Sequence, residues 1–234
     1  MSDNHHHEEN FFQKYIWSVD HKVIGIQYGI TSLLFLLFGF SLMAVMRYQL
    51  AYPESVIPYI GNWFFSESGG VMLPENYNTL GAMHGTIMIF LGVVPLAVGA
   101  FGNYLVPLQV GAPDMAFPKL NAASYWSYFV GGVIMMASFF TPEGAARSGW
   151  TSYPPLSIFE SGQTLWLIGM VFLITSSLLG SMNIIVTIVQ LRVEGLTWDR
   201  LPFFVWAQFV TSFLLVLAFP PLEAAGVLQL MDRL

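Results

Sequence analysis

Five long apolar stretches constrain this sequence more than any other feature. A helix needs about 20 mainly apolar residues to cross the hydrocarbon core of a bilayer. Only 9% of the 234 residues are charged, against roughly 25% in a soluble domain, which leaves too few charges to coat a soluble globule. Period-2 alternation is absent, which disfavours a β-barrel. The five predicted spans are 25–46, 79–106, 122–141, 163–191 and 203–222. We therefore predict an all-α integral membrane bundle, with a polar tail (1–23) before a five-span domain (24–234).

Charge and cysteine content exclude other classes. The net charge of −6 argues against a nucleic-acid partner. The absence of Cys excludes disulfides, thiolate metal sites and covalent c-type haem attachment. His5, His6 and His7 form a run that could hold a metal ion, although a polar or tag-like tail is the favoured reading.

The distribution of basic residues predicts the orientation. Cytoplasmic loops carry an excess of Lys and Arg. With the N-terminus inside, the inner side holds Lys14, Lys22, Lys119, Arg192 and Arg200, and the outer side holds Arg47, Arg147 and Arg233. The acidic Glu54, Glu67 and Glu75 then fall in the outer first loop. We predict an N-terminus on the cytoplasmic or matrix side.

His84 is the one histidine within a predicted span, near its outer end. Ionisable residues inside a membrane are functional candidates, so His84 is either a metal ligand or a hydrogen-bonded packing residue. Nearby glycines at spacings of 4, 7, 7 and 3 predict a smooth helix face, which would admit a neighbouring helix or a flat macrocycle. These glycines are Gly81, Gly85, Gly92, Gly99 and Gly102.

Three further residues fall on the predicted outer side. Arg47 ends the first span, where it could be an interfacial anchor or part of a site with His84. Trp150 and Tyr153 lie in the third loop, where aromatic residues commonly form an interfacial belt.

Polar residues gather on the predicted inner side. Asn103 follows His84 on the same span, about 28 Å further along the helix. Asp114 lies in the next loop, and Asn121 and Ser124 open the third span. Tyr28, at the start of the first span, and a stripe on the fourth span face the same side; the stripe comprises Ser176, Gly180, Asn183, Thr187 and Gln190. Local backbone bonding or helix association could explain each residue singly, but their convergence on Asp114 favours a hydrated proton path.

Several strings within this pattern resemble subunit I of the haem–copper oxygen reductases, and the resemblance extends from about Tyr15 to Arg233 in family order. They are SVDHK (18–22), MHGTIM (83–88), GNY (102–104), GAPDMAFP (111–118), GWTSYPPLS (149–157) and GSMNII (180–185). The resemblance implies that the bundle is the N-terminal part of a twelve-helix fold. It also implies a bacterial plasma membrane location, with the mitochondrial inner membrane as the alternative.

The resemblance implies a role for each candidate residue. His84 matches an axial ligand of the low-spin haem, and Arg47 matches the arginine that binds the formyl group of haem A, with haem B as the alternative. Trp150 and Tyr153 match the segment near the haem propionates. Asp114 is similar to the entrance of the D proton channel, as in the A-type branch. Asn103 and Asn121 match the gate of that channel. Five residues match positions of the channel that hold water: Tyr28, Ser124, Ser176, Ser177 and Asn183.

Some positions depart from the family pattern. Ala122 replaces a second Asn after the gate, and Gln49 replaces a Glu that often binds Ca²⁺ or Na⁺, which puts that cation site in doubt. Quinol-oxidising members carry His and Gln where this sequence has Asn76 and Thr79. We therefore expect cytochrome c as the electron donor, with quinol as the alternative.

The resemblance also implies ligands beyond this sequence, because the high-spin haem and CuB need further histidines. The sequence ends at Leu234, before the family's His-Pro-Glu-Val-Tyr motif. We expect a second chain of about seven spans, the C-terminal portion of subunit I, together with oxidase subunits II and III. The expected function is proton-pumping reduction of O₂, without activity in this chain alone. Alternatives are a non-catalytic haem-binding or assembly module and a haem-free transporter-like bundle.

Overall fold

The computed structural model describes residues 10–158 and 161–233. Five of its helices are long and apolar enough to cross a membrane, which confirms the predicted all-α membrane bundle. The His5–His7 run lies outside the described residues.

The long helices extend past the predicted spans at most ends. They are α2 (His21–Ala51), a continuous second span (Pro74–Val110), α6 (Pro118–Ala137, continued by η4, Ser138–Phe140), α7 (Ser161–Gln190) and α8 (Phe203–Arg233). The second span comprises α4 (Pro74–Thr86), η2 (Ile87–Val93), η3 (Pro95–Ala100) and α5 (Phe101–Val110). Short helices are α1 (Phe11–Tyr15), α3 (Gly61–Phe64), η1 (Ser66–Ser68) and η5 (Trp198–Arg200).

The last span continues to Arg233, through Pro220 and Pro221, although the sequence predicts its end at residue 222. Proline is tolerated inside membrane helices because neighbouring helices and polar side chains can satisfy the freed backbone groups. The helix α8 therefore carries eleven residues beyond the predicted span of about 203–222.

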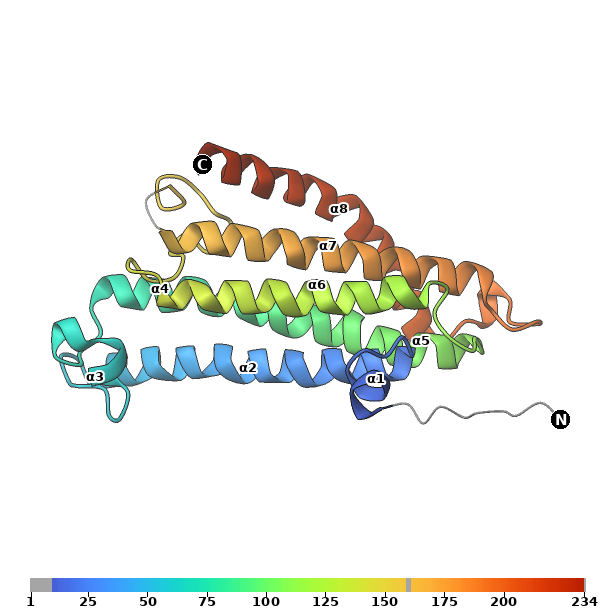
Figure 1. Cartoon of the computed structure of the whole chain (residues 1–234), viewed down its shortest axis with the longest axis horizontal. Coiled ribbons are helices and arrows are strands. Elements are labelled where there is room, and N and C mark those ends of the chain that lie inside the picture. Colours follow the sequence, from blue (N-terminus) through green and yellow to red (C-terminus); the bar gives the residue numbers. More distant parts are fainter. Residues whose placement is uncertain (1–9, 159–160, 234) are drawn as a thin grey trace.

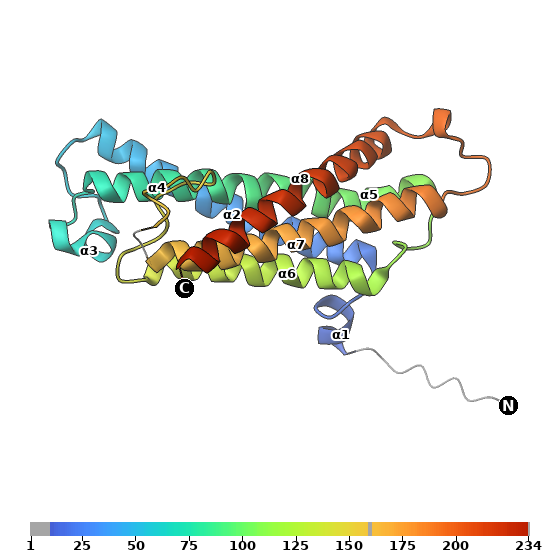
Figure 2. The ribbon, with the colours of Figure 1, turned by 90° about the horizontal axis from the view of Figure 1, so that it is seen from above.

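The long helices run side by side along the length of the molecule (Figure 1). The helix α2 packs against the second span and α6, α6 packs against α7, and α7 packs against α8. The C-terminal end of α8 lies toward the end of the bundle that carries α3, and α1 lies toward the opposite end (Figure 1). Figure 2 shows α8 crossing α7 obliquely, so the two halves of α8 meet different parts of the bundle.

Small residues set the contact between α6 and α7. A Cβ atom added to Gly131 would lie 2.9 Å from the carbonyl oxygen of Gly169, and a Cβ atom added to Gly169 would lie 2.9 Å from the carbonyl oxygen of Gly131. The two backbones therefore touch directly, as is common where membrane helices pack through glycine. This contact holds the polar side chains of α6 and α7 at close range.

The second span is π-helical over η2 and η3, and this wider winding rotates its faces away from the regular spacing that the sequence suggests. A Cβ atom on Gly99 would lie 2.6 Å from the ring of Tyr28 on α2, whereas one on Gly102 would meet Gln208 and Ile184 at 3.2 Å. The predicted single glycine face is therefore not formed. Gly92 and Gly99 serve helix packing against α2, while a Cβ atom on Gly85 would meet no atom of the described residues within 4 Å.

Candidate functional site

His84 is fixed to α2 by one ring nitrogen. Its Nδ1 lies 2.8 Å from the carbonyl oxygen of Gly39. Because a carbonyl oxygen can only accept, Nδ1 carries the proton and donates it, which leaves the lone pair of Nε2 for another partner. Metal-binding histidines are commonly oriented in this way by a hydrogen bond from their second nitrogen.

The surroundings of His84 fit one axial ligand of a haem. The side of α4 at the neighbouring Gly85 is open, and His84 itself is only partly buried. The other histidine in the described ranges, His21, lies at the opposite end of the bundle, where its Nδ1 is 2.9 Å from the carbonyl oxygen of Asn103. The described residues contain no group of three or more His, Cys, Asp or Glu side chains that could hold a metal ion.

The other predicted haem-binding residues make no hydrogen bond to His84 within the described part of the chain. Arg47 is exposed on α2, eight residues beyond Gly39 and thus about 12 Å further along the helix. Trp150 is 49% exposed, with its ring 6.3 Å from that of Phe90 on the second span. Tyr153 is 74% exposed in the same loop. Their roles at a haem stay predictions.

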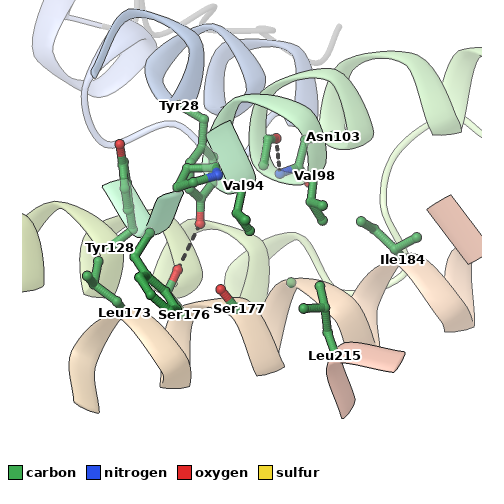
Figure 3. A pocket seen from close by; sticks show the side chains of 14 residues that line it. Tyr28, Val94, Val98, Asn103, Tyr128, Leu173, Ser176, Ser177, Ile184 and Leu215 are labelled. Atoms are coloured by element: carbon green, nitrogen blue, oxygen red, sulfur yellow. Dashed lines mark hydrogen bonds between the residues drawn. The ribbon is translucent and has the colours of Figure 1, made fainter. Parts of the chain in front are cut away.

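Three of the predicted proton-channel residues meet between α2, α6 and α7, and Figure 3 shows two of them, Tyr28 and Ser176. Tyr28 on α2 donates to Ser124 Oγ of α6 at 3.1 Å, and its hydroxyl lies 3.1 Å from Ser176 Oγ of α7. Ser176 donates to the carbonyl oxygen of Ser124 at 2.6 Å, and Ser124 donates to that of Asn121 at 2.7 Å. The hydroxyls of three helices thus form one hydrogen-bonded cluster.

A small cavity adjoins this cluster. It has a volume of about 30 Å³, and Tyr28, Asn103, Ser176 and Ser177 contribute polar side chains to its lining (Figure 3). A cavity needs roughly 10–15 Å³ to hold one water molecule. The space therefore has room for about two water molecules, next to groups that can hydrogen-bond them.

The two predicted gate asparagines have unused hydrogen-bonding capacity. Asn103 donates from Nδ2 to the carbonyl oxygen of Gly99 at 2.7 Å. Its Oδ1 is buried without a partner in the described part of the chain, as are Oδ1 and Nδ2 of Asn121. Buried polar atoms in native proteins are nearly always satisfied, by protein or by water. Both side chains are therefore suited to hold water molecules near the cavity.

The loop that carries Asp114 is tied to α7. Asp114 is half-buried, and its Oδ1 accepts a hydrogen bond of 2.6 Å from the backbone N–H of Met115. Asn183 accepts from the N–H of Phe117 at 2.9 Å and donates to its carbonyl oxygen at 3.1 Å. Thr187 accepts from the N–H of Ala116 at 2.9 Å. Both Oδ1 and Nδ2 of the Asn183 side chain thus anchor the loop. The resemblance did not indicate this contact.

We expect Asn183→Ala to loosen the Asp114 loop. The substitution leaves the N–H group of Phe117 without its partner, which should lower the free energy of unfolding by about 1–3 kcal/mol. The carbonyl oxygen of Phe117 still accepts from the N–H of Asn121 at 3.0 Å. Hydrogen exchange at the Phe117 amide should become faster, while that within α2 stays unchanged. Unaltered exchange at Phe117 would contradict the anchoring role.

Two residues that contact other helices carried no predicted role. His21 is 2% exposed, and its contact with the Asn103 backbone is visible only in three dimensions. Glu223 lies within α8, one residue past the predicted span. Extending the span through the Pro-Pro pair would have marked it as an intramembrane carboxyl group.

Gln49 occupies the position at which family members often carry a cation-binding Glu. Its Nε2 donates to the carbonyl oxygens of Tyr52 at 3.1 Å and Ser55 at 3.4 Å, and its Oε1 accepts from the N–H of Met72 at 3.0 Å. The neutral amide therefore donates to two carbonyl oxygens of the segment that follows α2.

Known proteins match nearly the whole chain. The family model described as cytochrome c and quinol oxidase polypeptide I matches residues 23–234. The chain is 44% identical over 224 residues to cytochrome c oxidase subunit 1 of Thermostichus vulcanus, covering 95% of this chain and 38% of that protein. It is 43% identical to the subunit 1 of a Synechocystis species (97% and 38% covered), and 41% identical to the heme-copper oxidase subunit I+III of Aeropyrum pernix (94% and 26% covered). The chain thus spans about 38% of the length of the first two relatives. Sequence, fold and relatives agree that the chain is an integral membrane protein of the cytochrome c and quinol oxidase polypeptide I family, the haem–copper oxidase subunit I family.

Proposed function

We propose that the chain supplies one low-spin haem ligand and a proton route to a cytochrome c oxidase. The observation that carries this proposal is the orientation of His84, whose Nδ1 donates to Gly39 and whose Nε2 remains for iron. Membership of a haem–copper family supports haem as the group bound there.

At the outer end, His84 would bind the iron of a low-spin haem, which supplies one-electron transfer. The hydrogen bond to Gly39 fixes the ring orientation and raises the basicity of the ligand nitrogen. The exposed guanidinium of Arg47 would donate to a formyl group if the haem is haem A, with haem B as the alternative. Trp150 and Tyr153 would face the propionates.

At the inner end, Asp114 would take up protons from water. Carboxylates exchange protons near neutral pH, whereas the amides of Asn103 and Asn121 only orient water molecules. Water held by these amides would pass a proton to the cavity beside Tyr28, Ser124 and Ser176. Ser177 lines the same cavity, and Asn183 would act by holding the loop of Asp114.

The rest of the reaction requires more than the described residues. We place the high-spin haem and CuB, where O₂ is reduced, on the part of the subunit I fold that this chain does not match. The partners would be the C-terminal portion of subunit I, subunits II and III, and cytochrome c, with quinol as the alternative donor. We place the protein in a bacterial plasma membrane, with the mitochondrial inner membrane as the alternative, and the N-terminus on the cytoplasmic or matrix side.

Purification of the tagged chain from its native membrane, together with its bound partners, tests the whole proposal. The complex should show a six-coordinate haem spectrum and consume O₂ with reduced cytochrome c faster than with quinol. A haem spectrum without O₂ consumption would instead indicate a binding or assembly module. Proton transport without any haem spectrum would indicate a transporter-like bundle and would overturn the haem assignment.

A further inference from the structure

A chain of side-chain hydrogen bonds joins the loop between η4 and α7 to both α7 and α8. Ser148 donates from Oγ to Gln163 Oε1 at 2.8 Å, and Gln163 donates from Nε2 to Ser152 Oγ at 2.8 Å. Ser152 donates from Oγ to Gln229 Oε1 at 2.7 Å, and Gln229 donates from Nε2 back to the carbonyl oxygen of Ser152 at 2.7 Å. Gln163 lies in the first turn of α7, and Gln229 lies in the C-terminal part of α8. We call these four residues the Ser152 clamp.

The centre of the clamp is buried. Gln163 is 0% exposed and Ser152 is 8% exposed. The hydroxyl of Ser152 accepts from Gln163 and donates to Gln229, so the hydrogen bonds run in one direction along the chain. A buried polar network whose members are satisfied makes its surroundings rigid, whereas removal of one member leaves another without a partner at a cost in stability.

The backbone at Ser152 has a conformation that needs such support. Its φ is +53°, in the left-handed region that residues with a Cβ atom rarely adopt. Such conformations persist where the surrounding structure fixes them. Gln229 bonds to both the hydroxyl and the carbonyl oxygen of Ser152, so it holds the side chain and the backbone together. The turn at Ser152 sets the direction of the chain on either side, which carries Trp150 and Tyr153.

The start of the same loop is attached to the second span. Arg147 donates from Nε to Thr79 Oγ1 of α4 at 3.1 Å. The ring of Trp150 lies 6.3 Å from that of Phe90, on the span that carries His84. The loop therefore bridges α4 and α8, and the clamp is its attachment on the side of α8.

The clamp gives Trp150 and Tyr153 a fixed place. Under the proposed function, on which this step rests, both side chains face the haem propionates. We propose that Gln163 and Gln229 are positioning residues, which hold these two side chains in that place through Ser152. Hydrogen bonding around a haem is one of the factors that set its reduction potential, so the clamp acts on the potential of the low-spin haem without touching it.

Gln229→Met in the purified complex tests this proposal. Methionine has a similar length but cannot donate to the carbonyl oxygen of Ser152. Amide hydrogen exchange in residues 148–157 should become faster by about tenfold or more, because loss of a buried partner raises the population of open states. The midpoint potential of the low-spin haem should shift, while its six-coordinate spectrum stays because His84 is unchanged. Gln163→Met should change both measurements in the same direction.

Gln27→Met is the matched control. Gln27 also donates from Nε2 to backbone carbonyl oxygens, those of Tyr15 at 2.7 Å and Ile16 at 2.9 Å, but near α1 at the opposite end of the bundle (Figure 1). This variant should leave the exchange in residues 148–157 and the potential unchanged. Unchanged exchange in Gln229→Met would overturn the clamp, and faster exchange with an unchanged potential would overturn its action on the haem.

A milder variant covers the case in which Gln229→Met does not assemble. Ser148→Ala removes only the first hydrogen bond of the clamp, so it should produce the same two changes at smaller size. Wild-type values in Ser148→Ala would then overturn the proposal. A wild-type complex without a haem would contradict the proposed function instead, while the exchange measurement would still decide whether the clamp holds the loop.

Discussion

Replacing His84 with alanine should abolish the low-spin haem spectrum of the oxidase complex. The substitution removes the imidazole whose Nδ1 bonds to Gly39 and whose Nε2 is the proposed iron ligand. Loss of an orienting partner alone commonly lowers metal affinity or activity 10–100-fold, so loss of the ligand itself should reduce electron transfer to O₂ by more than about 100-fold. Reduced-minus-oxidised spectra and O₂ consumption measure the two effects.

A matched variant separates ligand loss from general damage to the helix. Ile89→Ala alters a side chain on the same span that is 42% exposed, and it should retain both the haem spectrum and turnover. An unchanged spectrum in His84→Ala would show that His84 is a packing residue bonded to Gly39.

Asp114→Asn should slow turnover and abolish proton pumping while the haem spectrum stays intact. Asparagine can still accept the hydrogen bond from the N–H of Met115, so the loop should keep its shape. The amide cannot exchange protons, and loss of a positioned proton-transfer group typically reduces a rate by about 10²–10⁴-fold. Proton release from vesicles during turnover, measured beside O₂ consumption, distinguishes pumping from electron transfer.

Asp199 provides the control for this variant. It lies in η5, in the connection between α7 and α8. This connection lies at the same end of the bundle as the connection between α5 and α6, the segment that holds Asp114 (Figure 1). A hydrogen bond from Thr197 lowers the pKa of its exposed carboxyl group, so this group is ionised at neutral pH. Asp199→Asn removes the same charge without touching the proposed route and should pump normally. Normal pumping in Asp114→Asn as well would reduce Asp114 to a solvated loop charge.

The sequence predicted the polar centre better than the outer site. Tyr28, Ser124 and Ser176 are distant along the chain, yet the positions of polar residues on apolar spans predicted that they gather toward the same side. The structure brings them into contact. The glycines around His84 were wrongly predicted to lie on one helix face. Residues at regular spacing share a face only in a regular α-helix, and η2 and η3 are π-helical.

The sequence by itself determined the five-helix membrane architecture, because the number and length of apolar runs leave a chain few other ways to satisfy its backbone in lipid. It also marked His84 and Asp114, because ionisable and polar residues are conspicuous against an apolar background.

Only the tertiary structure decided which polar side-chain atoms have hydrogen-bond partners within the protein. Asn103 and Asn183 have the same side chain and a similar setting in the sequence. Asn183 bonds to the backbone of Phe117 through both Oδ1 and Nδ2. Asn103 has no partner for its Oδ1 in the described part of the chain. Hydrogen-bond partners depend on which backbone groups another helix or loop presents within about 3 Å. That proximity arises from the packing of α5, α6 and α7, which no local pattern encodes.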